Sequence, residues 1–300
     1  MNGVFFMSIN RVSRFFAEHA ALFACPICSQ PMRLQHRSLL CTHGHCFDIA
    51  KQGYVNLMLH TPKTKYDKPL FAARRIISRA GYFEPLLAHI CTGIVNTSSQ
   101  GSGEEPLRLL DAGCGEGSHL TFIQQKLRDQ AWRDVLGIGI DLSREGVRMA
   151  AKEAAPAIWC AADLARCPIA EERIDYILNI LSPSNYAEFR RMLKDEGMVI
   201  KAIPESDHLR QLRSLFFKRS KRRDYSNEHS VELFSKHFEL AAAERVRYNV
   251  LVEPANMEHL IRMTPLSWRA SDRLLREAID LNGRPTEITF DFSVLFGKKR

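Results

Sequence analysis

Four side chains that can bind a soft metal ion lie close together near the N-terminus. Cys25 and Cys28 belong to the stretch CPIC, whose two-residue spacing lets two thiolates face one ion. Cys41 and His45 supply a second pair a short distance along the chain. Four ligands of these types suit tetrahedral zinc in a closed structural site, which leaves no position open for catalysis.

The fourth zinc ligand has alternatives in the sequence. His43 and Cys46 lie within two residues of His45 and could replace it. A segment of ~40 residues cannot build a sufficient hydrophobic core, and zinc would replace that core. We therefore expect a zinc-binding module over residues 1–62 that begins with an amphipathic helix.

A second chemical signature is the glycine-rich stretch DAGCGEG, residues 111–117. It follows a short apolar strand and precedes an amphipathic helix over residues 118–128. Gly113, Gly115 and Gly117 permit positive φ and let a ligand approach the backbone closely. Such a turn binds either a dinucleotide or S-adenosylmethionine in doubly wound sheets, and the glycines alone do not separate the two.

Acidic residues at three strand ends favour S-adenosylmethionine. Asp141 closes the strand VLGIGID and could accept hydrogen bonds from the ribose hydroxyls of either cofactor. Asp111, at the start of the loop, shifts the balance, because LDAGCGEG resembles the first motif of class I methyltransferases more than the dinucleotide pattern. Asp163 closes the strand AIWCAAD, where that fold usually places an acid near the adenine amino group. The three strand ends therefore point at one cofactor.

The remaining pattern predicts an α/β fold, a doubly wound sheet of the class I (Rossmann-like) methyltransferase type. Residues 179–183, NILSP, lie where class I enzymes keep residues that face the transferred methyl group. Two late strands, separated by a helical insertion over residues 254–281, fit the antiparallel edge hairpin of this fold. We expect a helical connector over residues 63–100 and the methyltransferase domain over residues 101–300.

Composition and charge restrict the class of protein. Apolar residues make up 45% of the chain and charged residues 25%, as in a folded globular protein. No apolar run approaches the roughly 18 residues that a membrane-spanning helix needs. Charged residues interrupt the N-terminal segment where a secretory signal would be apolar, and eight cysteines without such a signal indicate a reducing compartment. We therefore expect a cytoplasmic protein with no membrane partner.

The net charge permits a polyanionic partner. Lys and Arg number 42 against 34 Asp and Glu, which leaves a formal charge of +8. Two basic clusters, residues 63–75 and 218–223, could hold phosphates. A solvated surface is the alternative interpretation of either cluster.

The chain as a whole resembles the bacterial 23S ribosomal RNA guanine-N1 methyltransferases, including the branch linked to macrolide and tylosin resistance. The resemblance covers nearly the whole chain. It rests on the order of CPIC, CxxxHCFDIAKQGYVNL, ARRIISRAGYFEPL, LLDAGCGEG, NILSPSNYAEFRRML and RMTPLSWRA. It implies that the zinc module recognises RNA and that a methyl group passes to N1 of a guanine. The target would lie in a 23S rRNA hairpin loop near the peptide exit tunnel, and the protein would form a homodimer.

The resemblance also implies particular site residues. It places zinc on Cys25, Cys28, Cys41 and His45. It adds cofactor contacts from the GYFEPL helix and from PESDHLRQL, although Phe83 replaces a tyrosine of some relatives and could simply pack in the core. The expected cofactor site then comprises Phe83, Asp111, Gly113, Gly115, Glu116, Gly117, Asp141, Asp163, Asn179 and His208.

Methylation of guanine N1 needs two further groups. N1 carries a proton, so the reaction requires a base and stabilisation of the charge that develops at O6. The sequence offers four bases without choosing among them: Asp163, Glu205, Asp207 and His208. A base splayed out of a hairpin loop would stack on an aromatic side chain. The candidates for stacking are Phe47, Tyr54 and Trp268.

Two other functions fit part of these observations. One is a class I methyltransferase that acts on another RNA, a protein or a small molecule. The other is a non-catalytic, zinc-containing RNA-binding protein. The intact glycine loop with acids at Asp141 and Asp163 argues against the second, because a protein without a cofactor has no need for this combination.

Overall fold

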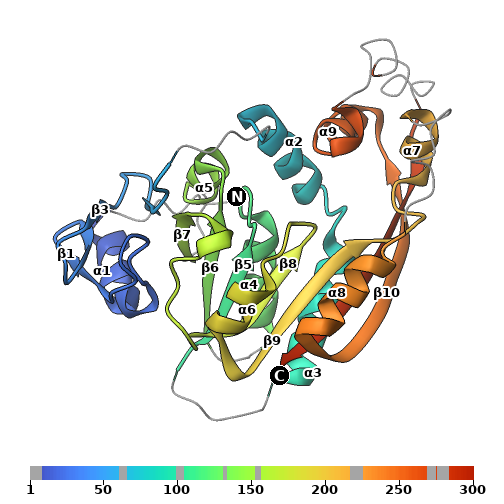
Figure 1. Cartoon of the computed structure of the whole chain (residues 1–300). Coiled ribbons are helices and arrows are strands. Elements are labelled where there is room, and N and C mark those ends of the chain that lie inside the picture. The colour runs from blue at the N-terminus through green and yellow to red at the C-terminus, as the bar shows by residue number, and fades with distance from the viewer. Residues whose placement is uncertain are drawn as a thin grey trace.

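The computed structural model describes most of the chain (Figure 1). The described residues are 9–60, 66–98, 105–130, 134–152, 157–216, 226–268, 275 and 284–300. The basic cluster at residues 218–223 and the start of the cluster at residues 63–75 lie outside them. So do parts of the expected connector and of the expected helical insertion.

The N-terminal module is a helix followed by a small antiparallel sheet with the strand order β1-β2-β3. Its elements are α1 (Ile9–His19), the 3-10 turn η1 (Ala20–Leu22), β1 (Met32–Gln35), β2 (Ser38–Cys41) and β3 (Cys46–Asp48). The next strand, β4 (Tyr54–Asn56), leaves this sheet and pairs in parallel with β7 (Ala157–Ala161). The module is thus joined to the large sheet through its last strand.

The large sheet has eight strands in the order β10-β11-β9-β8-β5-β6-β7-β4. In this order across the sheet, β9, β8, β5, β6, β7 and β4 run parallel to one another. Strands β11 and β10 form an antiparallel hairpin at one edge, and β11 pairs with β9. The remaining strands are β5 (Leu107–Ala112), β6 (Val135–Asp141), β8 (Ile174–Ile180), β9 (Leu193–Pro204), β10 (Phe238–Val252) and β11 (Thr286–Lys299). The expected fold class and edge hairpin are confirmed. Strand order reverses at β5, where such sheets bind ligands beyond their carboxyl ends.

Helices cover both faces of the sheet (Figure 1). They are α2 (Lys68–Arg79), α3 (Glu84–Thr97), α4 (Ser118–Asp129), α5 (Arg144–Ala150), α6 (Tyr186–Met192), α7 (Arg210–Phe216), α8 (Glu228–His237) and α9 (Pro254–Arg262). One core contains Ile90 of α3 and Leu260 of α9. The other contains Phe16 and Phe23 of the module together with Phe189 of α6. The module therefore shares a core with the large sheet. None of the described helices is long and apolar enough to cross a lipid bilayer.

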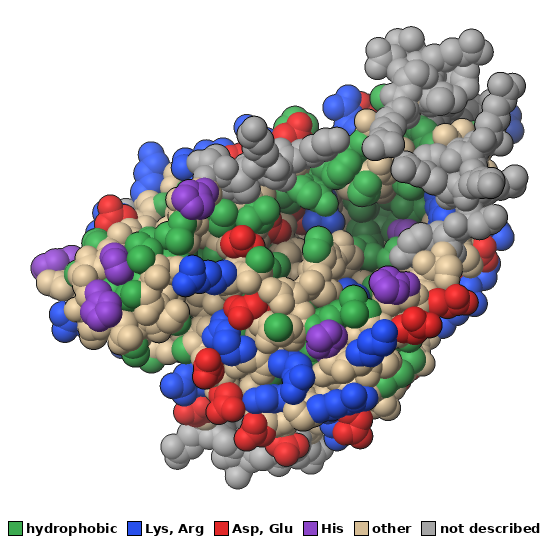
Figure 2. All heavy atoms as spheres, in the orientation of Figure 1, with side chains coloured by type: hydrophobic (Ala, Val, Ile, Leu, Met, Phe, Trp, Pro, Cys, Tyr) green, Lys and Arg blue, Asp and Glu red, His purple; other side chains and the backbone are tan. Residues whose placement is uncertain are grey.

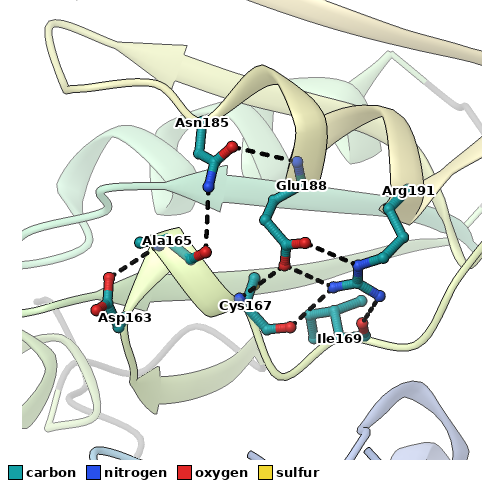
Figure 3. A network of polar contacts seen from close by, with 7 residues as sticks. All are labelled: Asp163, Ala165, Cys167, Ile169, Asn185, Glu188 and Arg191. Carbon is teal, nitrogen blue, oxygen red and sulfur yellow. Dashed lines mark hydrogen bonds and ion pairs between the residues drawn. The ribbon is translucent and has the colours of Figure 1, made fainter.

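Helix α6 holds the loop that follows β7 (Figure 3). The guanidinium of Arg191 donates to the carbonyl oxygens of Ile169 at 2.7 Å and Cys167 at 2.9 Å. The Glu188 carboxylate accepts from the Cys167 backbone N–H at 2.8 Å and pairs with Arg191. Three backbone groups of the loop are thus satisfied by two side chains about one turn apart on one helix.

The same loop contacts the zinc module on its other side. The Ala24 N–H donates to the Pro168 carbonyl at 3.0 Å, and the Ala170 N–H donates to the Leu22 carbonyl at 2.8 Å. Phe23 forms an isolated bridge with Ile169. The segment NYAEFRRML therefore connects the sheet to the module through this loop.

Replacement of Arg191 by Met should loosen that connection. Two carbonyls and one carboxylate lose their donor, so we expect unfolding in urea to require about 2 kcal/mol less free energy. Arg190→Met, which changes the exposed neighbour, should alter stability by under about 0.5 kcal/mol. Equal stability of the two variants would contradict this role of α6.

Candidate active site and zinc centre

The four predicted metal ligands converge in the module. One donor atom from each of Cys25, Cys28, Cys41 and His45 lies within 4.8 Å of the others. The Sγ atoms of Cys28 and Cys41 are 3.6 Å apart, and His45 Nδ1 is 3.5 Å from Cys25 Sγ and 3.4 Å from Cys41 Sγ. Tetrahedral zinc with ordinary bond lengths places its donors about 3.5–3.8 Å apart. The donor set and its spacing therefore fit Zn²⁺.

The other two candidates for the fourth ligand lie outside this cluster. Within the described residues, the group that could hold a metal contains His45 and neither His43 nor Cys46. His43 and Cys46 are exposed. Burial opposes ionisation of Cys41, but backbone N–H groups of the turn prevail and lower the pKa of its thiol to about 6. A lower thiol pKa favours the thiolate that binds metal.

The glycine loop has the tight geometry that its sequence predicts. Gly113, Gly115 and Gly117 have φ values of 94°, 56° and 85°. A Cβ atom on Gly113 would lie 2.6 Å from the Cβ of Ser182, and one on Gly115 would lie 2.9 Å from a guanidinium nitrogen of Arg74. Helix α2, which carries Arg74, therefore covers the loop closely, and side chains at these positions would collide with their surroundings.

Carboxylates gather around this loop. Both oxygens of Asp141 accept backbone bonds, from Gly115 N–H at 2.8 Å and Ser143 N–H at 2.7 Å. Asp111 and Glu116 are buried. Burial, together with the nearby charge of Asp141, raises the pKa of Asp111 to about 7 against the opposing charge of Arg74. Burial also raises the pKa of Asp141.

This acidic environment fits a cationic ligand such as a sulfonium. A positive charge near Asp111 and Asp141 would stabilise their ionised forms. A carboxylate has about four lone-pair sites, so Asp141 can still accept hydrogen bonds from a ribose. The two backbone bonds in turn hold the carboxylate against the glycine loop. The loop and its acids therefore suit S-adenosylmethionine.

Two other expected cofactor residues, Asp163 and Phe83, lie in environments that differ from each other. Asp163 is exposed at the start of the 3-10 turn η2 (Leu164–Arg166), where its Oδ1 accepts from the Ala165 N–H (Figure 3). Phe83 is buried at the start of α3, with its ring 5.0 Å from that of His119 and 5.6 Å from that of Phe290. Phe83 also lines a cavity, so core packing and a ligand contact are both compatible with its position.

Asn179 organises the end of β8. Its amide donates to Ser182 Oγ at 2.6 Å and to the carbonyls of Ala112 at 3.3 Å and Pro183 at 3.0 Å. Its Oδ1 accepts from Ser184 Oγ at 2.7 Å and from Lys201 Nζ at 2.6 Å. The NILSP turn is thereby tied to Ala112, where the glycine loop begins.

A cavity of about 860 Å³ opens beyond this turn. It lies between the carboxyl ends of β8 and β9, α7, α8 and the turn η4 (Pro265–Ser267) that follows α9. Figure 2 shows this face hollowed, with hydrophobic side chains gathered below α2 and α9. Arg74, Lys201, Arg213 and two histidines bring nitrogen groups to its wall. Among the described residues that line the cavity, none is Asp or Glu.

Three of the four expected bases lie outside the described lining of this cavity. These are Asp163, Glu205 and Asp207. Glu205 accepts hydrogen bonds from Asn227 and Ser293, and Asp207 pairs with Arg247 at 2.8 Å.

His208 does line the cavity, but it is a weak base. Burial lowers its pKa to about 3 against the opposing charge of Asp291, and its Nδ1 accepts the Asp291 N–H at 3.3 Å. In the neutral ring its Nε2 therefore carries the hydrogen and acts as a donor.

The expected stacking residues also differ in position. Tyr54 is 5% exposed, because β4 packs into the large sheet, and it is not free to stack on a base. Phe47 is half-buried on β3. Trp268 is 40% exposed, and its ring meets that of Tyr66 edge to face with centroids 5.6 Å apart. Tyr66, which also lines the cavity, is 41% exposed.

Sequence reasoning missed Tyr66, Arg74 and Lys201 as site residues. Arg74 was part of a basic cluster that could hold phosphates or form a solvated surface, and its place beside Gly115 depends on the packing of α2. Lys201 gave a usable signal, because it interrupts the apolar strand GMVIKAI. A charged residue within such a strand is almost never fully buried unless it has a partner.

Comparisons with known proteins agree with both halves of this site. Residues 23–63 match the zinc-ribbon family model described as RlmA, N-terminal, and residues 109–197 match a model of a methyltransferase domain. These matches cover the metal cluster and the strands around the glycine loop. They support zinc and S-adenosylmethionine as the two ligands.

Curated relatives extend over almost the whole chain. YxjB of Bacillus subtilis, named as a candidate 23S rRNA (guanine-N(1)-)-methyltransferase, is 41% identical over 285 residues, 93% of this chain and 98% of the relative. The 23S rRNA (guanine(748)-N(1))-methyltransferase of Streptomyces fradiae is 31% identical over 263 residues, 86% of this chain and 90% of the relative.

Removal of a zinc ligand should release the metal. We expect mass spectrometry to find one zinc ion per chain in the wild type and almost none in Cys28→Ser, because a three-ligand site binds zinc far more weakly. Cys46→Ser and His43→Ala change residues outside the cluster and should keep the ion. Zinc loss in Cys46→Ser with retention in Cys28→Ser would overturn the ligand set.

Neutralisation of Asp141 should weaken cofactor binding. Asp141→Asn loses the charge that stabilises a cation and disturbs the bond to Gly115, so calorimetry should show at least about 10-fold lower affinity for S-adenosylmethionine. Asp134→Asn is a matched control, because Asp134 is an exposed acid just before the opposite end of the same strand. Equal affinities in both variants would exclude Asp141 from the cofactor site.

Proposed function

The chain belongs to the family of 23S rRNA guanine-N1 methyltransferases, and we propose that it methylates N1 of one guanine in a hairpin loop of 23S rRNA near the peptide exit tunnel. The main observation is the contrast between two adjoining sites. Three carboxylates lie at the glycine loop, with Arg74 and Arg75 beside them, whereas the described lining of the adjoining cavity holds cationic and neutral groups and no carboxylate. A cationic methyl donor and an anionic nucleic acid would each meet complementary charge.

The size and lining of the cavity suit a single nucleotide. Its volume of about 860 Å³ falls within the range of small-molecule sites. Hydrophobic side chains provide contact area for a base, and Arg74 and Arg213 can pair with phosphate or with carbonyl oxygens. The exposed pair Tyr66 and Trp268 offers aromatic faces for bases of a splayed loop.

The chain's own groups would position the reaction. S-adenosylmethionine, when bound, supplies a methyl group that any adjacent nucleophile can attack. Asp111, Glu116 and Asp141 would hold the cationic donor at the glycine loop, and Asn179 fixes the turn between that loop and the cavity. The buried walls would exclude water and align N1 with the methyl group, which supplies most of the rate enhancement in such transfers.

The zinc module would extend the RNA-binding surface. It lies at the β4 end of the large sheet, and its backbone is bonded to the loop after β7 (Figure 1). Its cationic and histidine side chains face the same side as the cavity in Figure 2. A hairpin could therefore contact the module while one base enters the cavity. The proposal includes a homodimer, as the family resemblance implies.

Mass spectrometry of nuclease-digested 23S rRNA tests the proposal. A strain that lacks the gene should lose a single 1-methylguanosine, and the wild-type gene should restore it while Asp141→Ala should not. The position that corresponds to guanine 748 is examined first, because the Streptomyces fradiae relative is named for it. An identical nucleoside profile in all strains would exclude 23S rRNA and direct the search to other acceptors.

A further inference from the structure

Lys201 is a buried lysine in the wall of the proposed acceptor cavity. It lies on β9 directly opposite Asn179 of β8 and is 6% exposed. Its neighbours Ile200 and Ala202 are fully buried in the hydrophobic cores. A buried lysine is costly unless its charge is compensated or given up. Its position therefore calls for an explanation.

The contacts of Lys201 leave one position on its nitrogen unused. Nζ donates to Asn179 Oδ1 at 2.6 Å and to Ser184 Oγ at 2.6 Å. A neutral amine has two hydrogens and one lone pair, whereas an ammonium group has three hydrogens. The two bonds account for both hydrogens of the neutral amine and hold it in one orientation. The lone pair is then left for a third partner.

The surroundings favour the neutral amine. The titratable side chains that share the cavity wall with Lys201 are Tyr66 before α2, Arg74 of α2, Tyr186 of α6, His208 before α7, Arg213 of α7 and His229 of α8. None of these described groups is a carboxylate. Burial lowers the pKa of Lys201 to about 8. The ring of Tyr186 lies 5.8 Å from Nζ, and burial raises the pKa of its hydroxyl, which therefore stays uncharged.

Hydrogen bonds connect Lys201 to the start of the glycine loop. Asn179, which accepts from Lys201, donates to the carbonyl of Ala112 at the start of that loop. Ser182 donates to the same carbonyl at 2.6 Å and fills the space beside Gly113. Lys201 is thus held between the proposed methyl-donor site and the cavity.

We propose that Nζ of Lys201 is the general base that removes the N1 proton of the target guanine. The inference rests on the proposed function. The lone pair of Nζ takes the proton and forms an ammonium group, and the electrons of the N–H bond are left on N1. N1 then bonds to the methyl carbon as the carbon–sulfur bond breaks, with its electron pair going to sulfur. The ammonium group afterwards loses its proton to water.

Single-turnover methylation tests this role. A transcript of the 23S rRNA hairpin would be incubated with excess enzyme and saturating S-adenosylmethionine from about pH 6 to about pH 10. The neutral amine is the active form, so the wild-type rate should rise with pH, level off above about 8, and stay high. A rate that instead falls above this pH would show that the ammonium form is the active one and would overturn the proposal.

Three variants separate proton removal from charge and from folding. Lys201→Met lacks the base and should react at least about 100-fold more slowly. Lys201→Arg keeps the positive charge but cannot lose its proton, so it should be equally slow. Lys194→Met changes a lysine of the same strand that pairs with Asp175, and it should react like the wild type.

Cofactor binding provides a readout independent of turnover. All three variants should bind S-adenosylmethionine within about 3-fold of the wild type by calorimetry, because Lys201 acts on the acceptor. A large loss of affinity in Lys201→Met would assign the lysine to the donor site and contradict the proposal. Near-normal methylation rates in Lys201→Arg would also contradict the proposal. If the wild type itself fails to methylate the hairpin, the proposed function fails before Lys201 is tested.

Discussion

Burial of charge at the carboxyl edge of the parallel sheet is the constraint on which the site depends. Asp111, Glu116 and Asp141 surround the glycine loop, while Lys201 and Arg74 face the adjoining cavity. Each buried charge costs free energy unless a partner or a ligand compensates it. Some of this cost is met within the protein, because Asp141 accepts two backbone bonds and Arg75 pairs with Glu116. The charges that the protein does not compensate form two adjoining sites of opposite sign, which suit a cationic methyl donor and an anionic RNA.

The zinc module belongs to this arrangement through its backbone. Strand β4 extends the parallel sheet beyond β7, and the residues before CPIC bond to the loop that follows β7. Helix α6 holds the other side of that loop through Glu188 and Arg191. The metal therefore stabilises a segment that is continuous with the sheet, and the module's position relative to the cavity is set by hydrogen bonds on both sides of one loop.

Local patterns predicted the parts of the structure that depend on neighbouring residues. CPIC and the glycine loop were identified because ligand spacing and positive φ are properties of a few consecutive positions. The pairing of β4 with β7 was missed, since a three-residue strand carries little periodicity and its partner lies about 100 residues away. Tyr54 was one of three candidates for RNA stacking for the same reason, although its strand buries it.

The burial and charge state of ionisable side chains were the properties hardest to predict from the sequence. Lys201 lies within β9 and Asp163 follows β7 at the start of η2, yet Lys201 is buried beside the cavity and Asp163 is exposed. Burial and the surrounding charges determine whether a lysine can act as a base, and the sequence shows neither directly. Of the carboxylates offered as bases, Glu205 accepts a hydrogen bond from Asn227 and Asp207 pairs with Arg247, contacts that the sequence does not show.

The most direct test of this account is a structure of the enzyme with S-adenosylhomocysteine and the 23S rRNA hairpin. We expect the sulfur beside the glycine loop and one guanine inside the cavity, with its N1 within about 3.2 Å of Lys201 Nζ. A guanine bound outside the cavity, or an N1 that faces a carboxylate while Lys201 contacts only protein, would contradict it.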